Sequence, residues 1–263
     1  MPTPLEGTIK SFMNMTEKSK VSVVIPLFGY WEDENSKQLN ADTLKLTLER
    51  VYSNIHHLYL IFVAEEKRLP MNVGNILAAK SKGGNAKGVS MKRGATYGEY
   101  LRSGIATALE DTKCQYIVCV NPFVMLQHNA LDVLIDRCNK GDDARLISGF
   151  DVNGVISGDK FDGHIYNTPI DERNIDLNLF GMKRYIAEML PMDTKYKTHH
   201  FIARDLWQSL FAKGFESIVS QKIPIFSFDV DWSDFESRDD FELDKAHFIS
   251  KWHFNEDTIK YGK

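Results

Sequence analysis

The chain has 263 residues, of which 43% are hydrophobic and 26% are charged, and its formal net charge is −4. This length and composition fit one large α/β domain with a full hydrophobic core better than two independent domains. The slightly negative charge provides no general attraction for nucleic acid, so no nucleic-acid partner is expected. A local basic pocket for one phosphate-bearing ligand remains compatible with it.

The three cysteines are an odd number without C-x-x-C spacing, and they lie in or near apolar segments as Cys114, Cys119 and Cys138. This pattern predicts buried free thiols in a reducing compartment rather than a structural zinc site. Residues 1–20 contain no apolar stretch of signal-peptide length, and no later run reaches the roughly 18 apolar residues of a membrane span. We therefore expect a cytoplasmic protein with a polar leader.

The first predicted strand is the β-branched run at 21–25, whose nearly continuous apolar character is typical of a strand covered on both faces. Pro26 ends it, because proline cannot donate a hydrogen bond to a central ladder. Phe28 and Tyr30 follow, with Gly29 between them, at the kind of strand end where α/β proteins bind ligands. They are candidates for stacking on a flat ring. The alternative is a turn whose aromatic rings simply pack.

The next segments continue an alternating pattern. Residues 40–52 carry leucines at helical spacing, and residues 58–64 form a second buried strand. Residues 70–88 include the sequence KSKGGNAKG, which predicts a variable excursion over the surface. A short strand is expected at 87–91.

A capping box then predicts a helix start, because Thr96 is followed three residues later by Glu99, and the helix is expected to end near Leu109. A strand at 116–120 follows, and the apolar spacing at 131–135 indicates another helix. Strands and helices that alternate in this way form a parallel sheet through right-handed crossovers.

The second half is less regular. The expected elements are strands at 146–152 and 154–156, mixed helix and loop at 171–190, an amphipathic helix at 204–213 ended by Gly214, strand character at 217–230 and a last helix at 241–254. No linker separates the halves, so we expect a nucleotide-type α/β half fused to an acceptor-side half with one shared core.

Several segments carry a resemblance to a known family: VSVVIP, IFVAEE, RGATYGEYLRSGI, YIVCVNPFVML, FIARDLWQSLFAKGF with a β-hairpin expected after AKGF, and FISKW. In this order, over most of residues 21–252, the chain resembles a family 2 glycosyltransferase of the GT-A fold. The resemblance implies a Rossmann-like, mainly parallel sheet flanked by helices, with a mixed acceptor-side C-terminal half. Residues 21–263 would form a single domain after the leader at 1–20, with a nucleotide-binding half at 21–125 and an acceptor-side half at 126–263.

The resemblance also implies an activity. Members of this family transfer a sugar from a nucleotide-diphosphate donor to an acceptor hydroxyl with inversion, usually with a divalent cation such as Mg²⁺ or Mn²⁺. The implied partners are a nucleotide sugar and a glycan or other hydroxyl-bearing acceptor. The alternative is a catalytically inactive GT-A-like protein that binds a glycan, a nucleotide or a partner protein.

Two family motifs are altered. The family ends its fourth strand with Asp-x-Asp, which holds the ribose and the metal, whereas this chain has Asn121-Pro122-Phe123, an amide and an aromatic ring that suit a hard cation poorly. The family takes its base from a Glu-Asp-x-Asp-Leu motif. The corresponding residues of this chain are Ile202-Ala203-Arg204-Asp205-Leu206, so Asp205 is the one carboxylate of the motif that remains. We therefore expect little metal dependence, with Asp205 as the first choice for the base and Asp193 as the second.

The remaining candidates surround the implied donor: Pro26, Phe28, Tyr30, Glu65, Asn121 and Phe123 near the nucleoside, and Lys92 with Arg93 near the diphosphate. A solvated basic turn is the alternative for the two cations. Asp229 and Asp231 share one face of an expected strand and are weak metal candidates, with a polar strand edge as the alternative. The pairs His199 with His200 and His247 with His253 could serve as base or ligands, although loop and packing roles are the default.

Overall fold

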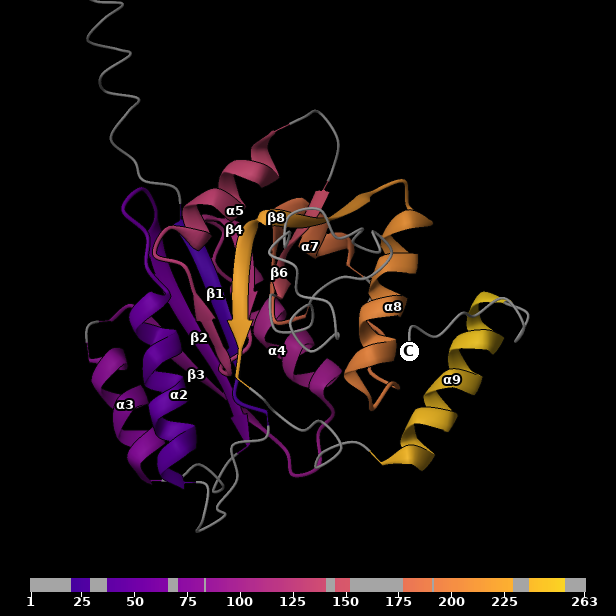
Figure 1. The fold of residues 1–263 in the computed structure, drawn as a ribbon, viewed down its shortest axis with the longest axis horizontal. Coiled ribbons are helices and arrows are strands. Elements are labelled where there is room, and N and C mark those ends of the chain that lie inside the picture. The colour runs from indigo at the N-terminus through magenta and orange to yellow at the C-terminus, as the bar shows by residue number, and fades with distance from the viewer. Residues whose placement is uncertain are drawn as a thin grey trace, which may run out of the picture.

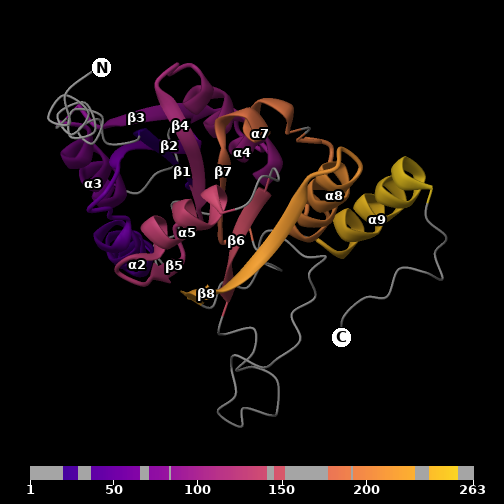
Figure 2. The same ribbon diagram turned by 90° about the horizontal axis from the view of Figure 1, so that it is seen from above.

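The computed structural model describes residues 20–28, 37–65, 71–82, 84–140, 145–151, 177–190, 192–228 and 237–253. Within these ranges the chain forms a mixed sheet between two layers of helices (Figures 1 and 2). The predicted strand at 154–156 lies outside the described residues, as do Tyr30, Asp229 and Asp231.

The sheet has eight strands in the order β3-β2-β1-β4-β7-β6-β8-β5. Their bounds are β1 (Lys20–Pro26), β2 (His57–Glu65), β3 (Ala86–Met91), β4 (Cys114–Val120), β5 (Val124–Leu126), β6 (Arg145–Asp151), β7 (Leu179–Lys183) and β8 (Glu216–Ser227). Strands β1 to β4, β6 and β8 run in one direction, and β5 and β7 run against them. The sheet therefore joins strands from both predicted halves of the chain.

Each face of the sheet is covered by its own helices. One face carries α2 (Lys37–Arg50), α3 (Met71–Ser81) and α5 (Ala130–Asn139), and the other carries α4 (Tyr97–Leu109), α7 (Arg184–Met189) and α8 (His199–Phe211). The last helix, α9 (Arg238–Trp252), packs outside α8 (Figure 1).

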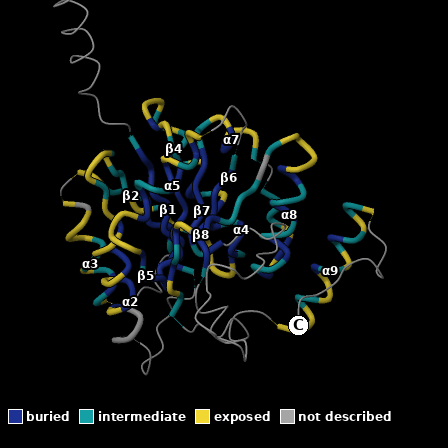
Figure 3. Tube along the Cα trace, turned by 45° about the horizontal axis from the view of Figure 1, so that its top comes forward, coloured by how far each residue is buried: buried dark blue, intermediate teal, exposed yellow. Residues whose placement is uncertain are grey.

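Strand β1 shows why its sequence is apolar at nearly every position. Val21, Val23 and Ile25 pack into the core under α2 and α5, whereas Val24 packs into the core under α4, because successive side chains of a strand point to opposite faces. All four are fully buried, which confirms the predicted two-sided burial (Figure 3). Pro26 is the last residue of the strand and pairs with Val63 of β2.

Helix α4 begins as predicted and packs closely on the sheet. The Thr96 side chain accepts a hydrogen bond from the Glu99 amide, and the Glu99 carboxylate accepts one from the Thr96 amide. In the middle of the helix, a Cβ added to Gly104 would lie 2.2 Å from a methyl carbon of Val24 and 3.0 Å from one of Val63. Glycine therefore lets α4 approach the first two strands.

The predicted excursion at 70–88 is wrong, because most of this segment is regular. Residues Met71–Ser81 form α3, with Val73, Ile76 and Leu77 at helical spacing against the core. Of the glycines that suggested a loop, Gly84 lies in the short turn before β3 with a φ of +72°, and Gly88 lies within β3 itself. The strand predicted at 87–91 is confirmed as β3.

The second half contains further corrections. The 171–190 segment was expected to be helix and loop, but it includes strand β7, which pairs with β4 and β6. In the described residues that follow AKGF the expected hairpin is absent, since β8 pairs in parallel with β6 and antiparallel with β5, a short strand that the sequence pattern did not indicate. Helix α8 begins at His199 rather than at residue 204, and Gly214, with a φ of +79°, follows its end.

Cys114, Cys119 and Cys138 are buried free thiols, as predicted. Burial raises the pKa of Cys138 to about 12 and also raises the pKa of Cys119. Across the described ranges, none of the helices combines the length and the apolar character that crossing a membrane requires.

Candidate functional site

The parallel strands end at one edge of the sheet, which is where open α/β sheets bind ligands. The strand-terminal residues at this edge are Pro26, Glu65, Met91, Val120, Asp151 and Ser227. The chain runs from β1 outward through β2 and β3 and then returns to place β4 on the other side of β1. The strand order therefore changes direction between β1 and β4, and the candidate site is centred there.

Phe28 follows β1 at this point, but its ring packs within the protein. It meets the rings of Tyr97 and Tyr100 edge-on, with centroids 5.6 and 5.4 Å apart. Both tyrosines belong to the first turn of α4 and are buried. The Phe28 ring thus packs against other aromatic rings of the protein, which is the alternative stated in the sequence analysis. Contact of Phe28 with a nucleoside stays a prediction.

The turn after β4 is rigidly held. The side-chain oxygen of Asn121 accepts a hydrogen bond from the Phe123 amide at 2.9 Å, and the Asn121 amide donates to the Asn178 carbonyl at 2.8 Å. The hydroxyl of Thr47 from α2 lies 2.8 Å from the Pro122 carbonyl oxygen and 2.7 Å from that of Val124. An asparagine that bonds the amide two residues ahead stabilises a tight turn.

Side chains in this turn face inward. Asn121 is 2% exposed and Phe123 is 7% exposed, with the Phe123 ring in the core under α2 and α5. The Phe123 carbonyl accepts a hydrogen bond of 2.7 Å from the Phe228 amide, just after β8. The position at which the resembled family has its second carboxylate is therefore filled by a packed ring.

Glu65 and the basic pair lie on the other side of the switch point. Glu65, the last residue of β2, is buried beside Met91 at the end of β3. Lys92 and Arg93 follow β3 and are exposed, and the Lys92 ammonium lies 3.4 Å from the carboxylate of Glu99. An exposed ion pair of this length is weak, so Lys92 can exchange it for another anion.

Asp151 is a carboxylate at this edge that the sequence analysis missed. It ends β6 and accepts hydrogen bonds from the Ser227 hydroxyl, from the Ser227 amide at 3.4 Å and from the Asn178 side-chain amide at 3.5 Å. The signal that could have found it is the one that selected Glu65, a carboxylate directly after a buried strand.

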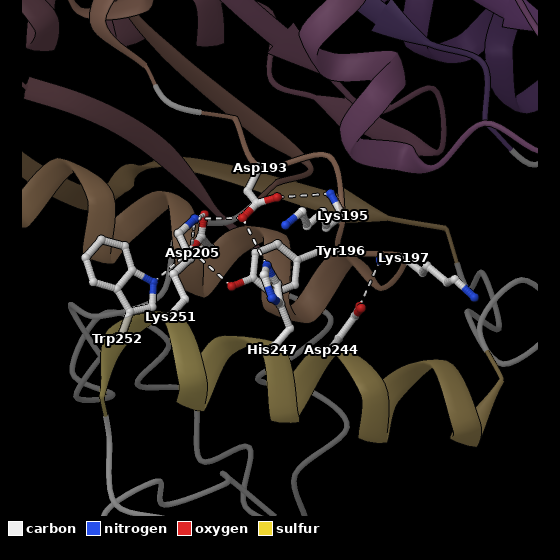
Figure 4. A network of polar contacts seen from close by, with 9 residues as sticks. All are labelled: Asp193, Lys195, Tyr196, Lys197, Asp205, Asp244, His247, Lys251 and Trp252. Atoms are coloured by element: carbon white, nitrogen blue, oxygen red, sulfur yellow. Dashed lines mark hydrogen bonds and ion pairs between the residues drawn. The ribbon is translucent and has the colours of Figure 1, made fainter.

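Asp205, the first choice for the base, lies inside α8 and is 2% exposed. Its carboxylate accepts hydrogen bonds from the Tyr196 hydroxyl at 3.1 Å, the Trp252 indole nitrogen at 2.7 Å and the Lys251 ammonium at 2.9 Å (Figure 4). Helix α9 thus supplies two of the three donors. A carboxylate enclosed in this way is placed to hold α9 on α8.

Asp193 belongs to the same network but is less enclosed, with 17% of its side chain exposed. It bonds the Lys251 ammonium at 2.9 Å, His247 at 3.1 Å and the Lys195 amide at 3.0 Å (Figure 4). Burial raises the pKa of Asp193, but these three hydrogen bonds outweigh burial and lower it to about 2. Lys251 therefore bridges both predicted base candidates.

A third carboxylate joins the same two helices. Asp244 of α9 accepts hydrogen bonds from the Lys197 amide at 2.9 Å, the Thr198 amide at 2.7 Å and the Thr198 hydroxyl at 2.8 Å. Thr198 is the N-cap residue of α8 and makes no side-chain cap of its own. Asp244 satisfies amides at the helix start that would otherwise lack a partner.

Two of the histidine candidates lie at the start of α8, and the other two lie within and directly after α9. His199 and His200 begin α8 rather than lying in a loop, and burial lowers the pKa of His200 to about 4, with nearby Arg204 adding to the effect. His247 contacts Asp193, and His253 follows α9 with a φ of 54°.

The metal candidates Asp229 and Asp231 lie outside the described residues. In the part of the chain that the structure describes, His, Cys, Asp and Glu side chains do not gather in threes around a point that could hold a cation. Separately, a cavity of about 910 Å³ opens at the opposite, amino edge of the sheet, where Lys20, His57 and Asn85 are among its lining residues. It is remote from the strand ends described above.

No protein-family model and no curated protein sequence matches the chain. Solved structures do match. The mannosyltransferase PcManGT from Pyrobaculum calidifontis, in complex with GDP-Man and Mn²⁺, has a TM-score of 0.58 at 13% identity, over 92% of this chain and 66% of that chain. Glucosyl-3-phosphoglycerate synthase from Mycobacterium tuberculosis, with Mg²⁺ and UDP, has a TM-score of 0.56 at 10% identity, over 99% of this chain and 88% of that one.

A third structure, GalNAc-T7 with UDP, GalNAc and Mn²⁺, has a TM-score of 0.61 at 9% identity and covers 89% of this chain. The chain spans 48% of the length of that protein and 66% of the mannosyltransferase. At such low identity the likeness concerns the fold. Together with the parallel sheet, its switch point and the helices on both faces, it shows that the chain has the GT-A glycosyltransferase fold.

Proposed function

We propose that this chain is an inverting glycosyltransferase, which moves a sugar from a nucleotide-diphosphate donor to an acceptor hydroxyl. The observation that carries the proposal is the GT-A fold, shared over 89–99% of the chain with three glycosyl-transfer proteins crystallised with nucleotides or nucleotide sugars. The polar strand ends around the switch between β1 and β4 support it, because this is the place where such a fold binds a ligand.

The strand ends suggest roles for the donor site. Pro26, Glu65 and Asn121 flank the switch point and would surround the nucleoside. Lys92 and Arg93, exposed just before the start of α4, would neutralise the diphosphate together with the amides of that helix start. Stabilising the departing diphosphate is the main electrostatic requirement of the reaction.

For the base, we favour Asp193 over Asp205. A base must reach the hydroxyl proton at hydrogen-bonding distance. Asp205 is enclosed by three donors, whereas Asp193 is partly exposed, and its backbone carbonyl oxygen would lie 3.6 Å from a Cβ added to Gly98 in the first turn of α4. Asp193 is therefore close to the helix start at which the diphosphate would bind.

The described residues do not fit a metal site of the family type. The Asn121 side-chain oxygen is engaged by the Phe123 amide, and the Phe123 ring is packed in the core. Neither position offers the charged oxygen that Mg²⁺ and Mn²⁺ prefer. We accordingly propose donor binding with little metal dependence.

A thermal-shift experiment with millimolar nucleotides tests the donor site. UDP or GDP should raise the melting temperature, since a ligand at 100 times its Kd adds about 2.7 kcal/mol of stability. Glu65→Gln should reduce this shift, whereas Glu110→Gln should not, because Glu110 is exposed and paired with Lys87 at the remote amino edge.

Turnover is then measured as release of nucleoside diphosphate from common nucleotide sugars with a panel of hydroxyl-bearing acceptors. Release that depends on the acceptor supports the proposal. Nucleotide binding without turnover on any acceptor would favour the catalytically inactive alternative, and absence of any nucleotide shift would overturn the donor site itself.

A further inference from the structure

A second candidate site lies at the amino edge of the sheet, away from the donor site. The cavity at this edge has a volume of about 910 Å³, within the range of about 300–1,000 Å³ that is typical of small-molecule pockets. Its walls come from the starts of β1, β2 and β4, the segment between α2 and β2, and the turns before β3 and β4. One cavity can touch these segments because β3, β2, β1 and β4 are neighbours in the sheet. The seven residues of β1 separate it from the opposite edge by about 23 Å.

The segments that line the cavity are fixed by hydrogen bonds within the protein. Between α2 and β2, the Ser53 hydroxyl accepts a hydrogen bond from the His56 amide at 2.8 Å and donates one to Asp132 of α5. Before β3, the Asn85 carbonyl accepts a hydrogen bond of 2.8 Å from the Leu60 amide. These walls are therefore ordered before a ligand arrives, which lowers the entropic cost of binding.

The charges at the cavity are largely balanced. The Lys20 ammonium forms an ion pair with the Asp111 carboxylate, which also accepts a hydrogen bond from the Lys113 amide at 3.0 Å. Burial lowers the pKa of His56, so its ring is neutral at pH 7. Lys113 and His57 are the basic lining residues that remain, and none of the described lining residues is Asp or Glu. Little net charge is left to attract an anion, so the cavity suits a neutral ligand.

Aromatic rings and neutral polar groups make up much of the remaining wall. The rings are those of Tyr52, which is 40% exposed, and Tyr59, which is partly buried in β2. Asn85, Thr112 and Gln115 are exposed, and across the described ranges their side chains have no hydrogen-bond partner in the protein. Amides and hydroxyls both donate and accept hydrogen bonds. A sugar presents the matching features, with hydroxyls around its edge and C–H groups on its faces.

We propose that this cavity binds a neutral oligosaccharide. The two tyrosine rings would pack against the C–H faces of the sugar rings, and the amide and hydroxyl side chains would bond the sugar hydroxyls. The site goes beyond the proposed transfer reaction, because it lies at the other edge of the sheet and shares no residue with the donor site. It would hold a part of a glycan that does not itself react.

Calorimetric titration of the full chain with maltotriose, cellotriose, mannotriose and chitotriose tests this inference. At least one of these trisaccharides should bind with a Kd of about 1 mM or tighter. Tyr52→Ala should weaken that binding by about fivefold or more, because the sugar loses an aromatic ring to pack against. Tyr185→Ala is the matched control, since Tyr185 is 41% exposed but belongs to α7, outside the cavity, and its loss should change the affinity by less than about twofold.

A second variant tests the polar part of the wall. Gln115→Ala changes an exposed side chain and should weaken binding of the same trisaccharide by about threefold or more, through loss of hydrogen bonds. The melting temperature of each variant shows whether it is folded.

Both cavity variants must weaken the binding for the inference to stand. It is overturned if none of the four trisaccharides binds, or if Tyr185→Ala weakens binding as much as Tyr52→Ala does. Inorganic phosphate provides the opposing probe. Phosphate binding that Gln115→Ala or Tyr52→Ala weakens would identify an anion site and overturn the inference as well.

Discussion

Two aspartates of the same network differ in what their surroundings permit. Asp205 is buried and accepts hydrogen bonds from Tyr196, Lys251 and Trp252, whereas Asp193 keeps part of its side chain exposed. Buried charges in proteins require partners, and removing one partner leaves the other uncompensated. The physical surroundings therefore assign Asp205 a role in stability and leave Asp193 to face a ligand.

Substituting each aspartate should separate these roles. Asp205→Asn should lower the free energy of unfolding by about 1–3 kcal/mol, because an amide cannot satisfy three donors that now bond a carboxylate. Asp193→Asn removes an ion pair with Lys251 as well, but it should also lower turnover by a factor of about 10² or more, the usual contribution of a general base, while nucleotide binding persists. Urea unfolding and nucleoside diphosphate release measure the two effects. Loss of turnover with unchanged stability in Asp205→Asn would return the role of base to Asp205.

At the scale of elements, α9 is connected to α8 and to the segment before it mainly through one face. Asp244, His247, Lys251 and Trp252 all reach from α9 to residues between Asp193 and Asp205 (Figure 4). Phe248, on the same helix, packs against Phe201 of α8 with ring centroids 5.7 Å apart. The position of the candidate base therefore depends on a helix that is distant in the sequence.

This connection should weaken in acid. The folded-state pKa of Asp193 is lowered to about 2, so the ionised carboxylate stabilises the fold at every pH above its unfolded pKa of about 3.9, and this contribution disappears as the pH falls through about 2. The difference in melting temperature between the unaltered chain and Asp193→Asn should therefore be largest above about pH 4 and shrink toward pH 2. A difference that grows on acidification would contradict the ion pairing of Asp193 with Lys251.

At the scale of the whole molecule, the sheet unites the two predicted halves. Strand β4 of the first half pairs with β7 of the second, and β5, close to the predicted boundary, pairs with β8. The site edge is consequently built by both halves, with Glu65 from one and Asp151 from the other. The boundary between residues 125 and 126 stays a prediction, as does the location of the protein in the cytoplasm.

The fold as a whole also bears on metal dependence. Phe123 occupies the core and offers no ligand to a metal. Nucleotide affinity measured with excess Mg²⁺ or Mn²⁺ should therefore stay within about threefold of the affinity measured in chelator. If a metal bridged the phosphates, the affinity would fall much further in chelator. Calorimetric titration of UDP and GDP in both buffers provides the measurement. A loss of tenfold or more in chelator would point to a metal site among residues such as Asp229 and Asp231, outside the described ranges.

The sequence alone determined the features that depend on neighbours along the chain. The apolar run of β1, the capping box of α4 and the buried cysteines follow from local periodicity and side-chain chemistry, and the structure confirms them. The tertiary structure decided what depends on distant partners. Strand β7 exists through its pairing with β4 and β6, two of the three donors that enclose Asp205 lie 46 and 47 positions away, and Asp151 meets Ser227 from another strand. Long-range pairing leaves no periodic signal in the sequence, and for this reason the enclosure of Asp205 and the contacts of Asp151 with Ser227 and Asn178 emerged only from the fold.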